Sequence, residues 1–201
     1  MQQNFFSKLF LISAFVSTVF IACEPDNDPY NGSPAQQIAA SEQLVIPEAV
    51  DLPLDPHITY TRVATFYAKG VQKYKAQIKA GSTPVEYQWV LAGPDAKLYD
   101  ATNQKVGSHG FGPHWEISPA DSIFAQHFTP QRTSPSPEPN TVPWLLLMPK
   151  VGTTPSGIFA DVDYIQRIAT QGGTAPATPP ASIDETTDVM YTAIYRFTKK
   201  N

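Results

Sequence analysis

The sequence has very little cysteine, and this limits its covalent chemistry. Cys23 is the only cysteine among 201 residues, so no disulfide can form within the chain. Charged residues are few, with 14 Lys and Arg against 18 Asp and Glu, which gives a formal net charge of −4 at pH 7. Binding to nucleic acid depends on Lys and Arg contacts to phosphates. The mild acidity therefore argues against nucleic acid as a partner.

Long hydrophobic runs are also missing. The most apolar stretch, Leu9–Ala22, is interrupted only by two serines and a threonine and is shorter than the roughly 20 residues of a membrane-spanning helix. It ends in Phe20-Ile-Ala-Cys23, which resembles a bacterial lipoprotein signal, where a small residue precedes a cysteine that is lipidated. We therefore predict a lipoprotein signal peptide over residues 1–22 and a membrane anchor of acyl chains on Cys23. The alternative is an ordinary secretory signal.

The residues after Cys23 contain many residues that break helices and strands. Glu24-Pro-Asp-Asn-Asp-Pro-Tyr-Asn-Gly-Ser-Pro34 cannot bury apolar surface, so residues 23–54 are predicted to be a lipidated N-terminus and a flexible tether. Within it, residues 35–44 could form one or two helical turns. The acidic residues next to Cys23 resemble surface-export signals of bacterial lipoproteins. We expect a protein of the cell envelope, at the outer membrane or the cell surface.

The remainder of the chain has no convincing amphipathic helix. Residues 55–201 suffice for one domain, and their apolar residues alternate with period two or form short β-rich runs between Gly and Pro. This pattern predicts a single all-β domain, an antiparallel sandwich or barrel of about nine strands. Trp144–Met148 is continuously apolar between two prolines and predicts a strand buried on both faces. The expected strands are 60–68, 71–80, 86–91, 97–99, 114–117, 121–128, 144–148, 157–170 and 189–199.

Seven short motifs occur in a characteristic order along this domain. Together they resemble the family catalogued as domain of unknown function 3455, which is found in secreted bacterial and fungal proteins. The resemblance covers nearly the whole domain and implies no established activity. The resemblance implies cysteines where this chain has Ala76 and Pro180, so this chain lacks one disulfide of the family. It also implies that a histidine is not usual at position 114. The motifs are Gly70-Val-Gln-Lys-Tyr74, Glu86-Tyr-Gln-Trp-Val90, Gly112-Pro-His-Trp-Glu116, Pro143-Trp-Leu-Leu-Leu147, Tyr164-Ile-Gln-Arg167, Gly172-Gly-Thr-Ala-Pro176 and Tyr191-Thr-Ala-Ile-Tyr195.

The richest chemistry lies between Gly107 and Glu116, which predicts a shaped loop that leads into a strand near His114. His114 and Glu116 share one face of that strand, and His109 and His127 could approach them, a combination that suits a divalent metal or acid–base chemistry. No dense metal-ligand spacing is present, however, so we expect neither a metal nor catalytic residues. The competing interpretation is that His109 hydrogen-bonds the backbone of a tight loop while Trp115 fills the core.

The function predicted from these residues is non-enzymatic binding of a small molecule, a glycan or a protein partner, without a cofactor. All-β domains with aromatic-lined loops commonly bind such ligands. The alternative is an envelope hydrolase or metal-dependent enzyme that uses His109, His114 and Glu116. Arg167 is expected to point outward from its strand. The candidate ligand-binding residues are His109, Phe111, His114, Trp115 and Glu116.

Overall fold

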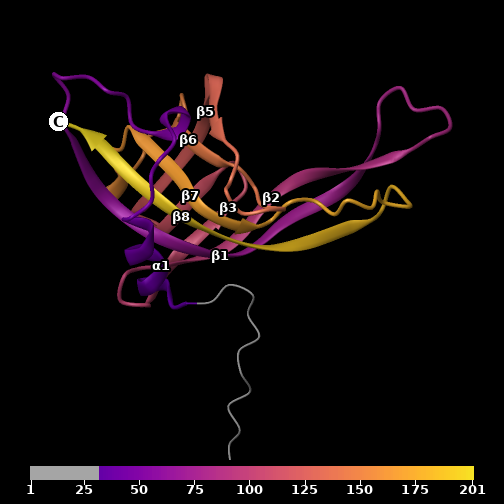
Figure 1. Ribbon diagram of the computed structural model, residues 1–201, viewed down its shortest axis with the longest axis horizontal. Coiled ribbons are helices and arrows are strands. Elements are labelled where there is room, and N and C mark those ends of the chain that lie inside the picture. Colours follow the sequence, from indigo (N-terminus) through magenta and orange to yellow (C-terminus); the bar gives the residue numbers. More distant parts are fainter. Residues whose placement is uncertain (1–31) are drawn as a thin grey trace, which may run out of the picture.

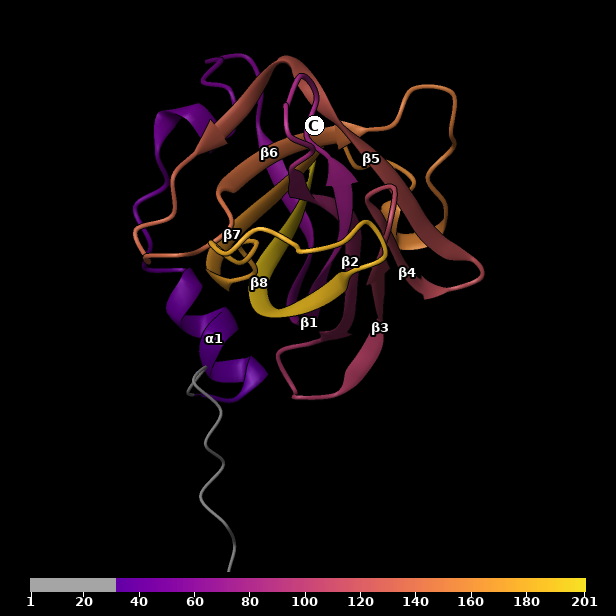
Figure 2. The same cartoon turned by 90° about the vertical axis from the view of Figure 1, so that its right-hand side faces the viewer.

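The computed structural model describes residues 32–201, which form eight antiparallel strands closed into a barrel (Figures 1 and 2). Each strand pairs with the next in the chain, and the last pairs with the first, so the connections run up and down. The all-β prediction is confirmed, with the closed barrel as its architecture. The strands are β1 (Tyr60–Ile78), β2 (Tyr87–Tyr99), β3 (Lys105–Gly110), β4 (His114–Ser118), β5 (Asp121–Ser134), β6 (Trp144–Pro149), β7 (Tyr164–Gly172) and β8 (Thr186–Lys200).

Gly70 and Gly93 lie between predicted strands, but the structure places them inside the long strands β1 and β2. A Cβ atom on Gly70 would sit 2.2 Å from the carbonyl oxygen of Asp95, so the glycine is needed for the close approach of β1 and β2. Gly93, with φ of 137°, and Pro94 follow a bulge in β2. At Gly93 and Pro94, β2 pairs only with β1, because its pairing with β3 begins at Ala96. The missing N–H of Pro94 therefore costs no hydrogen bond on that edge.

The predicted strands between residues 100 and 170 also needed correction. Residues 107–110, predicted as a loop, belong to β3, and a turn at 111–113 joins them to β4 at His114, where the strand was expected to begin. The strand predicted over 157–170 starts only at Tyr164. The residues before it form a short 3-10 turn, η2 (Gly157–Phe159), whose Phe159 side chain is fully buried. The predicted strands 60–68 and 71–80 are one strand, β1, and 86–91 and 97–99 are one strand, β2. Because β3 was not predicted, the nine predicted strands become eight.

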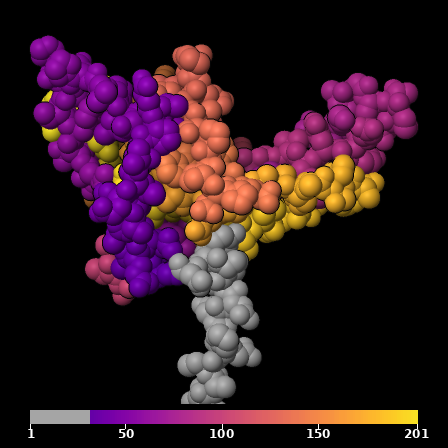
Figure 3. All heavy atoms as spheres, in the orientation of Figure 1, coloured from indigo at the N-terminus to yellow at the C-terminus, as the bar shows by residue number. Residues whose placement is uncertain are grey.

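Much of the predicted flexible tether packs on the barrel. The helix α1 (Pro34–Ser41) begins with a capping box at Ser33, and the 3-10 turn η1 (Glu48–Val50) follows it. Both lie over the outer face of the barrel, where Ile38 and Val50 pack with Trp144 and Leu146 of β6 (Figure 3). This cover explains why the apolar run of β6 is buried on both faces. Residues 23–31, including Cys23, and the predicted signal peptide lie outside the described residues.

Hydrogen bonds to backbone carbonyls hold this N-terminal segment in place. Arg132 donates to the carbonyls of residues 48, 49 and 51 over 2.8–3.1 Å, and Gln166 donates to that of Val50 over 2.9 Å. Arg196, almost fully buried, donates to the carbonyl of Ser41 over 2.7 Å. Donors on the barrel thus bind the backbone of the segment, at carbonyls that include those of Ala49 and Val50. Among residues 32–201, none of the helices has the length and apolar character to span a membrane.

The barrel is filled at one end and extended at the other. Phe66, Phe159 and Phe197 pack edge to face with ring centroids 4.8–6.5 Å apart, and η2 closes this end. At the opposite end β1 continues with β2 and β8 beyond their pairing with β3 and β7. We call this three-stranded extension, residues 71–95 and 173–190, the arm; it projects to the right in Figure 1. Ala76 and Pro180 are both buried in the arm, and the family disulfide at these positions stays a prediction.

A pair of valine substitutions tests whether the N-terminal segment contributes to the stability of the fold. Val50, the last residue of η1, is fully buried against the barrel, whereas Val45, five residues earlier, is 91% exposed. Val50→Ala should lower the free energy of unfolding by about 1–3 kcal/mol, and the control Val45→Ala should change it by less than about 0.5 kcal/mol. Urea denaturation measures both. Equal, near-zero effects would mean that the segment is a free tether.

Candidate ligand-binding site

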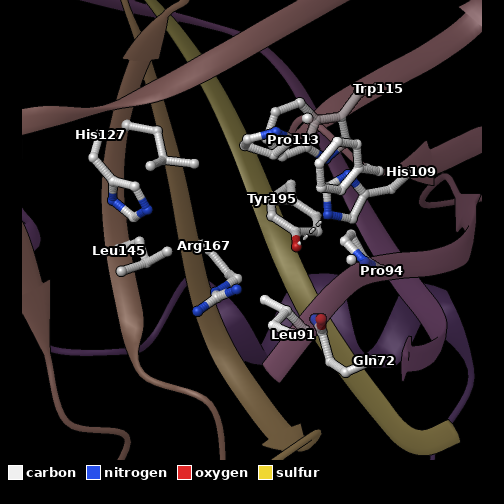
Figure 4. A pocket seen from close by; sticks show the side chains of 14 residues that line it. Gln72, Leu91, Pro94, His109, Pro113, Trp115, His127, Leu145, Arg167 and Tyr195 are labelled. Atoms are coloured by element: carbon white, nitrogen blue, oxygen red, sulfur yellow. Dashed lines mark hydrogen bonds between the residues drawn. The ribbon is translucent and has the colours of Figure 1, made fainter. Parts of the chain in front are cut away.

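A cavity of about 350 Å³ opens where the barrel meets the arm (Figure 4). Its size lies at the small end of the range for ligand pockets, and its walls are mostly apolar. The cavity exists because the large aromatic side chains fill the other half of the barrel. All eight strands and the β3–β4 turn supply its lining, which consists of Gln72, Leu91, Gly93, Pro94, His109, Phe111, Gly112, Pro113, Trp115, His127, Leu145, Leu147, Arg167 and Tyr195.

Strand alternation places the polar lining residues on the inner face. In antiparallel pairs, residues directly opposite each other share a face, and successive residues alternate. Leu145 of β6, which packs in the interior cluster, is paired with Arg167 of β7, and Arg167 with Tyr195 of β8. Arg167 therefore points into the barrel (Figure 4), and the prediction that it points outward is wrong.

His109 forms the most constrained part of the site. Its ring stacks on Trp115 with centroids 4.5 Å apart and an interplanar angle of 10°, and both side chains are buried. Nδ1 lies 2.8 Å from the carbonyl oxygen of His114, and Nε2 lies 3.0 Å from the hydroxyl of Tyr195. The predicted structural role of His109 agrees with this geometry, since one ring nitrogen contacts the backbone.

These contacts determine which atoms carry protons. A carbonyl oxygen only accepts, so Nδ1 of His109 carries the hydrogen and donates it. In neutral imidazole Nε2 then accepts, and the donor is the hydroxyl of Tyr195. Burial lowers the pKa of His109 to about 3, and the charge of Arg167 also acts in that direction. Burial raises the pKa of Tyr195. At neutral pH both groups are uncharged, and the phenolic oxygen keeps lone pairs for an acceptor role.

Arg167 is the one cationic side chain among the cavity-lining residues. Its Nε and Nη2 both donate to the carbonyl oxygen of Pro143, over 3.1 and 2.8 Å, which fixes the guanidinium plane. Within residues 32–201, no Asp or Glu forms an ion pair with it, and none lines the cavity. Burial, followed by the charge of Arg167, lowers the pKa of His127. The cavity therefore carries a positive charge without a counter-charge from the described residues.

Two buried polar atoms in the lining have no hydrogen-bond partner within the described part of the chain. These are Oε1 of Gln72 and Nε1 of Trp115, and both side chains are at most 2% exposed. A buried polar group without a partner costs about 1–3 kcal/mol. The hydroxyl of Tyr191 on β8 is unpartnered in the same way. These buried atoms therefore lower the stability of the fold.

The structure separates the residues that the sequence grouped. His109, Phe111 and Trp115 line the cavity, with Phe111 76% exposed at its rim. His114 and Glu116 flank the inward-pointing Trp115 on β4, so their side chains face the outside of the barrel. There His114 stacks on Phe124, and its Nε2 lies 3.8 Å from a carboxylate oxygen of Glu116. The barrel wall lies between His109 and these two residues. Residues 32–201 contain no cluster of three His, Cys, Asp or Glu that could hold a metal, so a metal site built from these residues has no geometric basis.

Several lining residues were not predicted from the sequence as ligand contacts. Gln72, Tyr195, Arg167 and Pro94 come from strands that are far apart in the chain, and only closure of the barrel brings them together (Figure 4). His127 was proposed as a neighbour of His114, but it lines the cavity instead. Ile165 and Arg167 of the Tyr-Ile-Gln-Arg motif share the inner face of β7, but the motif alone does not show which face is the interior.

The low pKa of His109 predicts an acid-dependent loss of stability. His109 has a pKa of 6.5 in the unfolded state and of about 3 in the folded state. Its contribution to the free energy of unfolding is therefore fully present above pH 6.5 and is lost as the pH falls toward 3. His109 should contribute up to about 1.4 kcal/mol per pH unit to that slope. Chemical denaturation between pH 7 and 4.5 should show a shallower slope in His109→Gln. Val50→Ala, which alters packing on the outer face of the barrel and no titratable group, should keep the wild-type slope. Equal slopes in wild type and His109→Gln would contradict the assignment.

Comparison with known proteins gives one result. No curated protein and no solved structure matches the chain. Residues 56–199, nearly the whole barrel, match the family model described as protein of unknown function (DUF3455). The order of the seven motifs noted in the sequence agrees with this match, which has no established activity attached to it. The chain belongs to the DUF3455 family.

Proposed function

We propose that this protein is a lipid-anchored domain of the cell envelope that binds a small, mostly apolar molecule in the cavity at the arm end of its barrel. The observation that supports this most directly is the cavity itself: apolar walls surround a few polar groups on the inner face. Ligand sites commonly combine these two features, because burial of apolar surface supplies affinity and the few polar groups fix orientation. A small molecule fits the dimensions better than a protein partner, which would need a surface of larger area.

Catalysis is a weaker candidate for the same cavity. His109 uses both ring nitrogens in fixed hydrogen bonds, and burial keeps it neutral. A general base needs a pKa near the operating pH and a nitrogen within reach of the reacting group. His127 lines the cavity without a carboxylate to orient it among the described residues. We therefore assign His109 to the architecture of the site.

The anchor is proposed on the sequence alone. Cys23 follows an apolar segment with a small residue before it, and several acyl chains on one residue would hold the protein at a membrane. The envelope location, at the outer membrane or the cell surface, rests on the same residues. From residue 34 on, the chain is packed on the barrel, so only about ten residues after Cys23 would separate the lipid from the folded domain.

Binding is tested with N-phenyl-1-naphthylamine, a neutral apolar dye that becomes fluorescent in apolar surroundings. It should bind saturably with one site per chain. Leu91→Trp, which enlarges a half-exposed side chain on the cavity rim, should weaken binding at least ~10-fold, about 1.4 kcal/mol. Val151→Trp places the same side chain on an exposed site outside the cavity and should bind as wild type does. No saturable binding, or equal effects of the two variants, would reject the proposed site.

The anchor is tested by Cys23→Ser, which removes the sulfur that would carry the lipid. The variant should leave the membrane fraction or persist as an uncleaved precursor, because no thioether can form. Fractionation and a mass measurement of the wild-type N-terminus read out both effects. A variant that stays with membranes at the processed size would show that the attachment does not depend on Cys23.

A further inference from the structure

The cavity offers hydrogen-bond donors and a positive charge, and this restricts what it can bind. The Arg167 guanidinium lines the cavity, and its Nε and Nη2 donate to the carbonyl oxygen of Pro143, so the plane of the group is held. Within residues 32–201, no Asp or Glu forms an ion pair with it. The indole N–H of Trp115 is a further donor without a partner in the described chain, and Oε1 of Gln72 is an acceptor without one. Both of these side chains are almost fully buried.

The lining side chains that could accept a hydrogen bond carry no negative charge, and among those described the amide oxygen of Gln72 lacks a partner. The Tyr195 hydroxyl gives its proton to His109, and His109 gives its own to the carbonyl of His114. Neither group can take up a proton at neutral pH, since burial holds the pKa of His109 near 3. No Asp or Glu among residues 32–201 lines the cavity. A ligand with a positive charge would meet Arg167 without any compensating carboxylate.

A partly buried charge without a counter-charge is unfavourable, and a bound anion relieves it. Arginine presents its N–H groups in a planar arrangement that matches the two oxygens of a carboxylate. Figure 4 shows Arg167 between His127 on one side and Tyr195 and Gln72 on the other. The remaining walls, including Leu91, Leu145 and Leu147, are apolar. The site thus combines one anion-binding group with an apolar surround.

We propose that the ligand is a small amphipathic carboxylic acid whose carboxylate binds Arg167, with Gln72 beside it, and whose apolar body packs against the leucines and Trp115. This inference rests on the proposed function, because it names the class of molecule that the cavity takes. It adds a specific role for Arg167, which binds the anionic group directly. The apolar body accounts for affinity, and Arg167 accounts for the choice of an acid over a neutral compound of the same shape.

The test compares decanoate with decanol, which have the same chain length and differ in charge. Both are measured at pH 7.5 by displacement of N-phenyl-1-naphthylamine from purified protein. Decanoate should displace the dye at a concentration at least ~10-fold lower than decanol, because hydrogen bonds to charged groups are stronger than neutral ones. Equal displacement by the two compounds in wild type would overturn the inference while leaving the proposed binding function intact. Failure of the dye itself to bind would instead reject the proposed function.

Variants then assign the preference to one residue. Arg167→Gln should lose the ~10-fold preference for decanoate over decanol, and Arg167→Lys, which keeps the charge, should retain part of it. Lys97→Gln removes one positive charge from an exposed position on β2 and serves as the matched control, with the preference unchanged. A preference that survives in Arg167→Gln, or disappears in Lys97→Gln, would contradict the assignment. The wild-type comparison of the two ligands remains decisive if Arg167→Gln does not fold.

Discussion

The aromatic stack inside the barrel is the feature on which the rest of the structure depends. A continuous series of ring contacts runs from Phe159 at the closed end through Phe197 and Trp115 to His109, with neighbouring centroids 4.5–5.6 Å apart. Such pairs contribute beyond the area that they bury. The series fills the closed end of the interior, and its last members, Trp115 and His109, form part of the cavity wall. The cavity is the consequence of this uneven distribution of volume.

The same stack fixes the electrostatics of the cavity. Trp115 and Tyr195 enclose His109 so completely that its charged form is unfavourable, and the carbonyl of His114 selects its tautomer. The hydroxyl proton of Tyr195 is thereby committed as well. Arg167 is left as the only charged side chain in the cavity lining of the described chain. Packing and hydrogen bonding together produce a cavity with one sign of charge.

The architecture could largely be predicted from the sequence, because alternation and strand-breaking residues are local signals. The run from Trp144 was correctly predicted to be buried on both faces, but its cause, a cover formed by the N-terminal segment, involves residues almost one hundred positions earlier. The same cover explains the error at Arg167. Tyr164, Ile165 and Gln166 are all buried, so the sequence of β7 does not show which face is the interior. Gly70 was misinterpreted because a glycine required by close strand contact looks the same as one required by a turn.

The pairing of β1 with β8 has a consequence for how the protein folds. Tyr60 pairs with Lys200, so this contact closes nearly the entire barrel sequence into one loop, whereas the other strand pairs follow one another along the chain. Loop-closure entropy opposes such distant contacts, and chains that depend on them fold slowly. Until β8 joins, both β1 and β7 expose an unpaired edge, and Tyr195 is missing from the cavity wall. A ligand can therefore interact with the complete site only after the last strand has docked, and its binding would slow the reopening of that strand.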